Sequence, residues 1–163
     1  MDKLKLVVTK TSMLAERQLN YLLNPNLNRI LPPFVNLGKL GLNFGMQGVQ
    51  FTATSTTAEN QMLSNPMYVH SIPNNNDNQD IVSMGTNAAL ITKKVIENAF
   101  EVLAIELITI TQAVEYLNMK DKVSSKTKAM FDDIRSIVPK FEEDVVMYPY
   151  VKAVKDFLIN QGD

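Results

Sequence analysis

The chain has 163 residues, a formal net charge of −1, 45% hydrophobic and 20% charged residues, which is typical of one globular domain over residues 1–163. Its 16 Lys and Arg residues are scattered, which argues against a nucleic-acid-binding protein. The sequence has no cysteine and one histidine, which excludes disulfides, thiol catalysis and His-based metal clusters, so we expect no metal site.

The first predicted element is a helix over residues 2–23, where apolar residues recur at near-helical spacing. It lacks an opening cap, which predicts that the chain begins inside a helix. Asn24 and Pro25 end it, and an irregular connection follows to about residue 43. No stretch reaches the roughly 20 apolar residues of a membrane span, and the N-terminal apolar run is too short for a signal peptide. We therefore expect a cytoplasmic protein.

The third predicted helix is the dominant element. A second helix, rich in small residues, is expected over residues 44–64 and ends before Pro66. The third runs from about residue 79 to 117, a length of ~60 Å. Residues 99–114 are apolar on nearly every face, which is typical of a helix buried on all sides. Such a helix would overhang a domain of about 15 Å radius of gyration. We expect other chains, or missing parts of a longer chain, to surround it, and hence self-association.

Two shorter helices complete the predicted chain. Ser124 and Ser125 are expected to cap a helix that ends at Pro139. The last helix, over residues 149–160, is amphipathic. No strand-like alternation of useful length occurs, so the predicted class is all-α. Residues 1–118 are predicted to form the bundle helices and a functional loop, and residues 119–163 a peripheral helical pair.

A polar cluster, HSIPNNNDNQDIVSMG, occupies residues 70–85 before the long helix. One interpretation is an anion site, because the unpaired N–H groups and the dipole of a helix start attract a carboxylate. The other interpretation is a loop and cap, in which Asp77 and Asp80 cap the helix and touch no ligand. The residues alone leave both open.

The chain resembles the aromatic amino acid ammonia-lyases, a family that includes histidine, phenylalanine and tyrosine ammonia-lyases and related aminomutases. Six stretches carry the resemblance in order: LAERQLNYLL at 14–23, LPPF at 31–34, GLNFG at 41–45, AEN at 58–60, the polar cluster, and IENAFEVLAIEL at 96–107. The resemblance implies a long central helical bundle of the ammonia-lyase and fumarase type, shared within a tetramer.

The resemblance also implies that the chain corresponds to the C-terminal third of a family member. The family's electrophile is a methylidene-imidazolone group formed from an Ala-Ser-Gly tripeptide, and that tripeptide is absent from these 163 residues. The family's base-bearing tyrosine loop and carboxylate-binding arginine also precede the region matched here. The chain alone is therefore predicted to hold no cofactor and to be inactive.

Gln79 is the most discriminating candidate residue. Histidine-type members present a glutamate at this position, whereas phenylalanine- and tyrosine-type members and aminomutases share the Asn-Gln-Asp that ends at Asp80. A carboxylate can take a proton from an imidazole, whereas a neutral amide cannot act as a base. This favours phenylalanine or tyrosine over histidine as substrate of the parent, which would release ammonia and an arylacrylate. By resemblance, Gln79 orients the substrate, and Asn78 and Asn75 hold its carboxylate.

A second class of function is a non-catalytic helical oligomerisation protein derived from the lyase bundle. The natural length of the polypeptide separates the two, because only a longer chain could carry the Ala-Ser-Gly segment. Two further residues receive structural interpretations. His70 has no partner at a recognisable spacing and is given no role. Glu106 lies among apolar residues and is expected to form an ion pair or hydrogen bond with another helix.

Overall fold

The computed structural model describes residues 1–161 and consists of helices and loops. No strand forms in that span, and its only β-type pairings are two isolated bridges. The predicted all-α class is confirmed. In chain order the elements are α1 (Asp2–Leu23), α2 (Pro25–Asn28), the 3₁₀ helix η1 (Pro33–Val35), α3 (Gln47–Leu63), α4 (Gly85–Tyr116), the 3₁₀ helix η2 (Lys120–Lys122), α5 (Ser125–Ile137) and α6 (Tyr148–Asn160).

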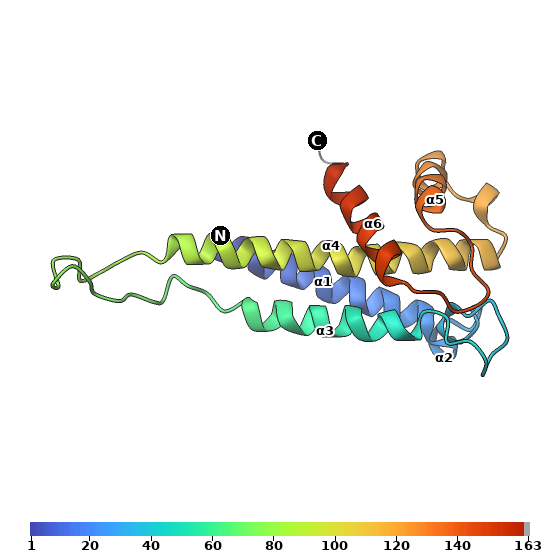
Figure 1. The fold of residues 1–163 in the computed structure, drawn as a ribbon, viewed down its shortest axis with the longest axis horizontal. Coiled ribbons are helices and arrows are strands. Elements are labelled where there is room, and N and C mark those ends of the chain that lie inside the picture. Colours follow the sequence, from blue (N-terminus) through green and yellow to red (C-terminus); the bar gives the residue numbers. More distant parts are fainter. Residues whose placement is uncertain (162–163) are drawn as a thin grey trace.

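Three long helices form the body of the molecule. α1, α3 and α4 lie side by side along the long axis, with α1 and α4 parallel and α3 antiparallel to both (Figure 1). α5 and α6 pack on α4 toward its C-terminal half. The core fills the space between these helices with aliphatic side chains, which include Leu19, Val102, Ile105, Ile108, Ile134 and Val154.

A buried polar layer crosses the three long helices. The Asn60 side-chain amide of α3 donates to Ser12 Oγ of α1 (3.0 Å) and to the Val95 carbonyl of α4 (3.2 Å). Asn98 of α4 donates in turn to Asn60 Oδ1 at 3.0 Å. Thr9 Oγ1 donates to the Asn60 backbone carbonyl. Because each polar atom needs its partner at one height, this layer fixes the longitudinal register of the helices.

The apolar centre of α4 is covered within this one chain. Every residue from 99 to 114 is buried or half-buried, and the exposed large apolar residues of this 32-residue helix are Leu90 and Tyr116. α1, α3, α5 and α6 pack on α4 and cover most of its centre, and the association with other chains or missing parts stays a prediction. The exposed apolar side chains lie instead largely on α1, α3 and the connecting loops.

α4 begins at Gly85, six residues later than predicted. Gln79 cannot start the helix because its backbone N–H and C=O are paired with those of Asn74. The N-cap is Met84, without a side-chain hydrogen bond, and the Asp80 carboxylate accepts from its neighbour Ile81 N–H instead. The interpretation in which Asp77 and Asp80 cap the long helix is therefore wrong.

α3 begins at Gln47, three residues later than predicted. The carboxylate of Asp144, far along the chain, accepts hydrogen bonds from the backbone N–H groups of Phe44 and Gly45. Gly45 has φ +57, and a Cβ there would come within 2.9 Å of the Phe34 carbonyl oxygen. This contact requires glycine and holds the segment in a turn before the helix.

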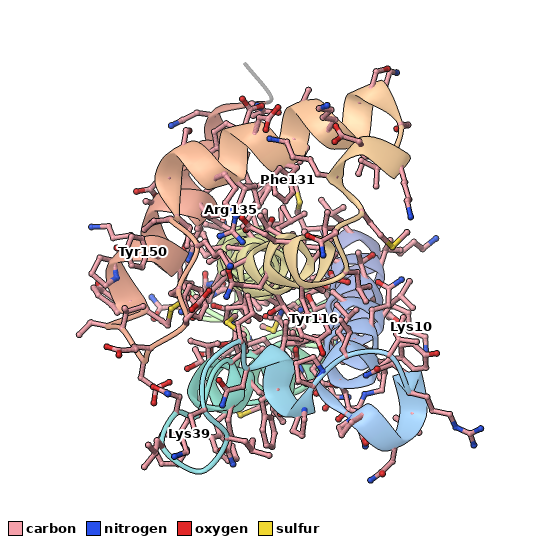
Figure 2. The ribbon with its side chains drawn as sticks, turned by 90° about the vertical axis from the view of Figure 1, so that its right-hand side faces the viewer. Lys10, Lys39, Tyr116, Phe131, Arg135 and Tyr150 are labelled. Atoms are coloured by element: carbon pink, nitrogen blue, oxygen red, sulfur yellow. The ribbon has the colours of Figure 1, made fainter. Side chains whose placement is uncertain are left out.

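The last two helices agree with their predicted bounds. Ser124 Oγ accepts from Thr127 N–H at the start of α5, which confirms the predicted cap. Arg135 of α5 points toward α4 (Figure 2), where it donates to Gln112 Oε1 at 2.7 Å and pairs with Glu115 at 2.5 Å. Gln112 also donates to the Phe141 carbonyl. These polar contacts join α5 and the following loop to the C-terminal part of α4.

Glu106 has no side-chain partner among residues 1–161, and a partner across a subunit boundary stays a prediction. Its side chain is only 8% exposed, yet it forms no hydrogen bond or ion pair with any other residue in the part of the chain that the structure describes. Arg17 of α1 lies at the same hollow, but its guanidinium is bound to Glu16. Burial raises the pKa of Glu106 to about 7. A carboxylate without a partner is thus held at the edge of the α1–α4 interface.

Glu106→Gln should make the fold more stable in alkaline but not in acidic solution. A raised carboxyl pKa means that stability is complete below the ordinary pKa of about 4.3 and falls as the pH rises through about 7. After a discount for solvent screening, we expect a gain of ~1–2 kcal/mol in unfolding free energy near pH 8.5 and none near pH 4. Denaturant unfolding of dilute protein measures this, with the exposed Glu143→Gln as control. An equal gain at both pH values would contradict it.

Asn60→Ala should destabilise the bundle by ~2–3 kcal/mol, because it removes one hydrogen bond each from the buried Ser12 hydroxyl, Val95 carbonyl and Asn98 amide. Denaturant midpoints provide the measurement. Asn65→Ala is the matched control, since that exposed side chain bonds only locally to Met62. A loss no larger than that of the control would show that the polar layer does not hold the helices together.

Candidate functional site

The loop between α3 and α4 is a long arm that extends beyond one end of the helices (Figure 1). All three predicted site residues lie at its tip, where Asn74 and Gln79 exchange backbone hydrogen bonds of 3.0 and 3.3 Å. Asn78 N–H donates to the Asn75 carbonyl inside this closed turn at 3.1 Å. The structure thus brings Asn75, Asn78 and Gln79 together on one six-residue turn, away from any helix start.

The turn has an unusual backbone. Asn75, Asn76 and Asp77 have φ values of 53, 52 and 62, which places three consecutive non-glycine residues in the left-handed region. Asn and Asp adopt this region more readily than other side chains because their short polar groups bond locally. The dense asparagine run is therefore explained by local geometry, and the same geometry gives the tip a defined shape.

The side chains of the tip are free to bind a ligand. Every residue from 70 to 81 is exposed, and Asn75, Asn78 and Gln79 form no side-chain hydrogen bond within residues 1–161. The side-chain amides of Asn75, Asn78 and Gln79 supply both hydrogen-bond donors and acceptors, which suit a carboxylate and a neutral aromatic group. None of them can serve as a general base.

Hydrogen bonds join the two segments of the arm that lead into and out of the tip. Ser71 Oγ accepts a hydrogen bond of 2.9 Å from Val82 N–H and lies 3.5 Å from the Asp80 carbonyl. Ser71 was not singled out from the sequence. A lone serine nine residues before Asp80 and eleven before Val82 gives no recognisable signal, because the pairing depends on the turn between them.

The base of the arm is anchored on the first turn of α1. The Asp2 carboxylate accepts from the backbone N–H groups of Met67 and Tyr68, both at 3.0 Å. Lys5, which is fully buried, donates to the Asn65 carbonyl at 2.5 Å and pairs with Asp2 at 3.0 Å. The Met67 N–H is the main cause that lowers the pKa of Asp2, with Lys5 adding to it. The weak sequence signal was a lysine placed three residues after an aspartate at the start of the first helix.

Two kinds of site are not found among residues 1–161. No group of three or more acidic or histidine side chains is placed to hold a metal ion there. No helix in the same span is long and apolar enough to cross a membrane. His70 lies on the exposed part of the arm and forms no side-chain hydrogen bond in the described structure.

Comparison with known proteins places the chain in a family. The model of the family described as aromatic amino acid lyase matches residues 1–136. The chain belongs to this family. Histidine ammonia-lyase 1 of Fusobacterium nucleatum is 38% identical over 157 residues, which are 96% of this chain and 30% of the relative. Tyrosine ammonia-lyase of Cupriavidus metallidurans is 36% identical over 162 residues, 99% of this chain and 30% of the relative.

Solved structures of aromatic amino acid lyases and aminomutases share the fold. The tyrosine aminomutase of Streptomyces globisporus superposes with a TM-score of 0.96 at 36% identity, over 99% of this chain and 31% of that one. The histidine ammonia-lyase of Trypanosoma cruzi superposes with a TM-score of 0.89 at 31% identity, over 99% of this chain and 31% of that one. This chain therefore spans about 30% of the length of the relatives that it matches.

Asp2→Asn should release the base of the arm without unfolding the helices. We expect faster amide hydrogen exchange at Met67 and Tyr68, because the neutral amide offers one acceptor oxygen and loses the charge-assisted pair with Lys5. Since the pKa of Asp2 is lowered, the protection in the unmodified protein is present above the ordinary value of about 3.9 and is lost only at lower pH.

Amide exchange followed by NMR gives the measurement. Asp133→Asn is the control, because Asp133 is exposed and its carboxylate has no partner within the described residues. Unchanged exchange at Met67 and Tyr68 in Asp2→Asn would show that the carboxylate does not anchor the arm.

Proposed function

We propose that this chain supplies one wall of the substrate site of an ammonia-lyase or aminomutase that acts on aromatic amino acids. The observation that carries the proposal is the closed turn at the arm tip, which presents Asn75, Asn78 and Gln79 without side-chain partners. In this role Asn78 and Asn75 hold the amino-acid carboxylate, and Gln79 orients the substrate side chain. Charge on the carboxylate strengthens hydrogen bonds from the two amides.

The chain's own residues limit what it does in this reaction. The 163 residues contain no Ala-Ser-Gly tripeptide, so they offer no segment from which the methylidene-imidazolone group of the family could form. We therefore assign this chain binding and orientation only, and infer that it is inactive alone. Removal of the β-proton needs a base with a suitable pKa, and the amides of the tip do not provide one.

Gln79 supports a phenylalanine- or tyrosine-type substrate. A neutral amide pairs with an uncharged ring substituent or packs beside it, whereas an imidazole is better served by a carboxylate. Relatives of both types match this chain with similar identity, so the preference rests on this side chain. The alternative, a non-catalytic oligomerisation protein, draws support from the apolar side chains that α1 and α3 expose, such as Leu14 and Phe51.

We also propose that the chain associates with copies of itself or with the remaining part of a longer polypeptide, as the tetramers of the family imply. The arm supports this proposal, because a binding turn whose residues are all exposed cannot enclose a substrate. Walls contributed by other segments would complete the cavity around the tip.

The proposed substrate role can be tested in a chimera. Residues 1–163 replace the matching 30% of the tyrosine ammonia-lyase of Cupriavidus metallidurans, which aligns with 99% of this chain. We expect the chimera to release ammonia from tyrosine, and Gln79→Glu to lower kcat/KM for tyrosine by ~10–100-fold, with a smaller loss or a gain for histidine. Gln61→Glu, at an exposed position of α3 outside the arm, is the matched control.

Two results would contradict the proposal. A Gln79→Glu chimera with unchanged kcat/KM for both amino acids would remove Gln79 from the substrate site. The 163-residue chain alone is assayed in parallel, and arylacrylate formation by that chain would overturn its assignment to binding and orientation only.

A further inference from the structure

Backbone pairing between the two segments of the arm ends directly behind the tip. The last backbone pair joins Asn74 and Gln79, with hydrogen bonds of 3.0 and 3.3 Å. In a regular antiparallel hairpin the next hydrogen-bonded pair would join Ile72 and Ile81. The Ile81 N–H donates to the Asp80 carboxylate instead, and no bond between Ile72 and Ile81 forms in the described structure. The arm therefore lacks the ladder that would hold a longer hairpin rigid.

One side chain takes the place of the missing pair. Ser71 Oγ accepts a hydrogen bond of 2.9 Å from Val82 N–H, and its hydroxyl donates to the Asp80 carbonyl oxygen at 3.5 Å. We call these two contacts the Ser71 tie. Within residues 1–161, they are the only hydrogen bonds that join the two segments between the tip and the base of the arm at Met67 and Tyr68.

The tie acts on the backbone next to Gln79. Its two partners, Asp80 and Val82, lie one and three residues after Gln79, so at most ~10 Å of chain separates the tie from that residue. The arm extends beyond the helices (Figure 1), and its residues 70–81 are all exposed. Since the tip is closed by its own backbone pair, loss of the tie would let the whole tip pivot as a unit about the exposed segments.

We propose that Ser71 is a positioning residue for the amino-acid site at the tip. Its tie sets where Gln79 stands relative to the side chain of the substrate, and so contributes to the preference for tyrosine over histidine. The inference rests on the proposed function of the tip. Because its hydroxyl is committed to two backbone groups, Ser71 acts through the backbone and touches no substrate. Displacement of an orienting group by about 1 Å is enough to change a rate by an order of magnitude or more.

Amide exchange in the 163-residue chain tests the tie itself. We expect Ser71→Ala to speed exchange of Val82 N–H by ~5-fold or more, because that group loses its acceptor. Exchange of Gln79 N–H should follow, since its pair with Asn74 is no longer closed from behind. Ser71→Thr keeps the hydroxyl and should restore both. Ser83→Ala is the matched control, because Ser83 is exposed on the same arm and its hydroxyl forms no hydrogen bond within the described span.

Substrate preference in the tyrosine ammonia-lyase chimera tests the positioning role. We expect Ser71→Ala to lower the ratio of kcat/KM for tyrosine to kcat/KM for histidine by ~5–10-fold. Ser71→Thr should restore the ratio, and Ser83→Ala should leave it unchanged. A purely structural role would lower the amount of folded enzyme without moving this ratio, because the concentration of active enzyme cancels from it.

A double variant shows whether Ser71 acts through Gln79. In the Gln79→Glu chimera the amide that the tie positions is absent, so Ser71→Ala should lower the ratio by less than it does in the parent chimera. An equal loss in both backgrounds would mean that Ser71 affects the site by another route, and would overturn the proposal.

The outcomes separate this inference from the proposed function. Unchanged exchange of Val82 N–H in Ser71→Ala would overturn the positioning role and leave the substrate role of the tip standing. An unchanged ratio for Ser71→Ala, in a chimera that does respond to Gln79→Glu, would do the same. A chimera whose ratio does not respond to Gln79→Glu contradicts the proposed function, and this inference falls with it.

Discussion

The rest of the structure depends on the hydrogen bonds made by the buried side-chain amide of Asn60. It joins α1, α3 and α4 in one polar layer, through Ser12, the Val95 carbonyl and Asn98. A slide of one helical turn, ~5.4 Å, would break all of these hydrogen bonds between helices in the core. The layer therefore fixes where α1 begins relative to the end of α3. That relation places Asp2 beside Met67 and Tyr68, and so sets the point at which the arm leaves the bundle.

Local sequence signals predicted much of the fold, and distant contacts account for its errors. The bounds of α1, the Ser124 cap and the all-α class follow from periodicity, proline and capping chemistry, which act within a few residues. The start of α3 depends on Asp144, about 100 residues away, and no local pattern contains that information. The cover that α1, α5 and α6 give to α4 could not be predicted for the same reason, because these helices lie at both ends of the chain.

At the candidate site, the residue types could be predicted from the sequence but their geometry could not. Asn75, Asn78 and Gln79 were chosen by resemblance, and the functions assigned to their side chains remain predictions. The helix-start interpretation does not apply to the tip, because Gly85 begins α4 six residues after Gln79, and the field of a helix end fades within one turn. The substrate recognition proposed for the tip therefore depends on the side-chain amides. The left-handed run at Asn75–Asp77 could not be predicted, since an asparagine-rich turn is compatible with several backbone conformations.

The exposed arm between α3 and α4 poses an energetic problem. The arm exposes every residue from 70 to 81, and so gains little burial to hold its shape. Its anchored base, the Ser71 tie and the closed tip remove much of its freedom in advance, which lowers the entropy cost of docking against other walls. Because the arm is ordered in advance, the docking proposed for it would lose little further conformational entropy.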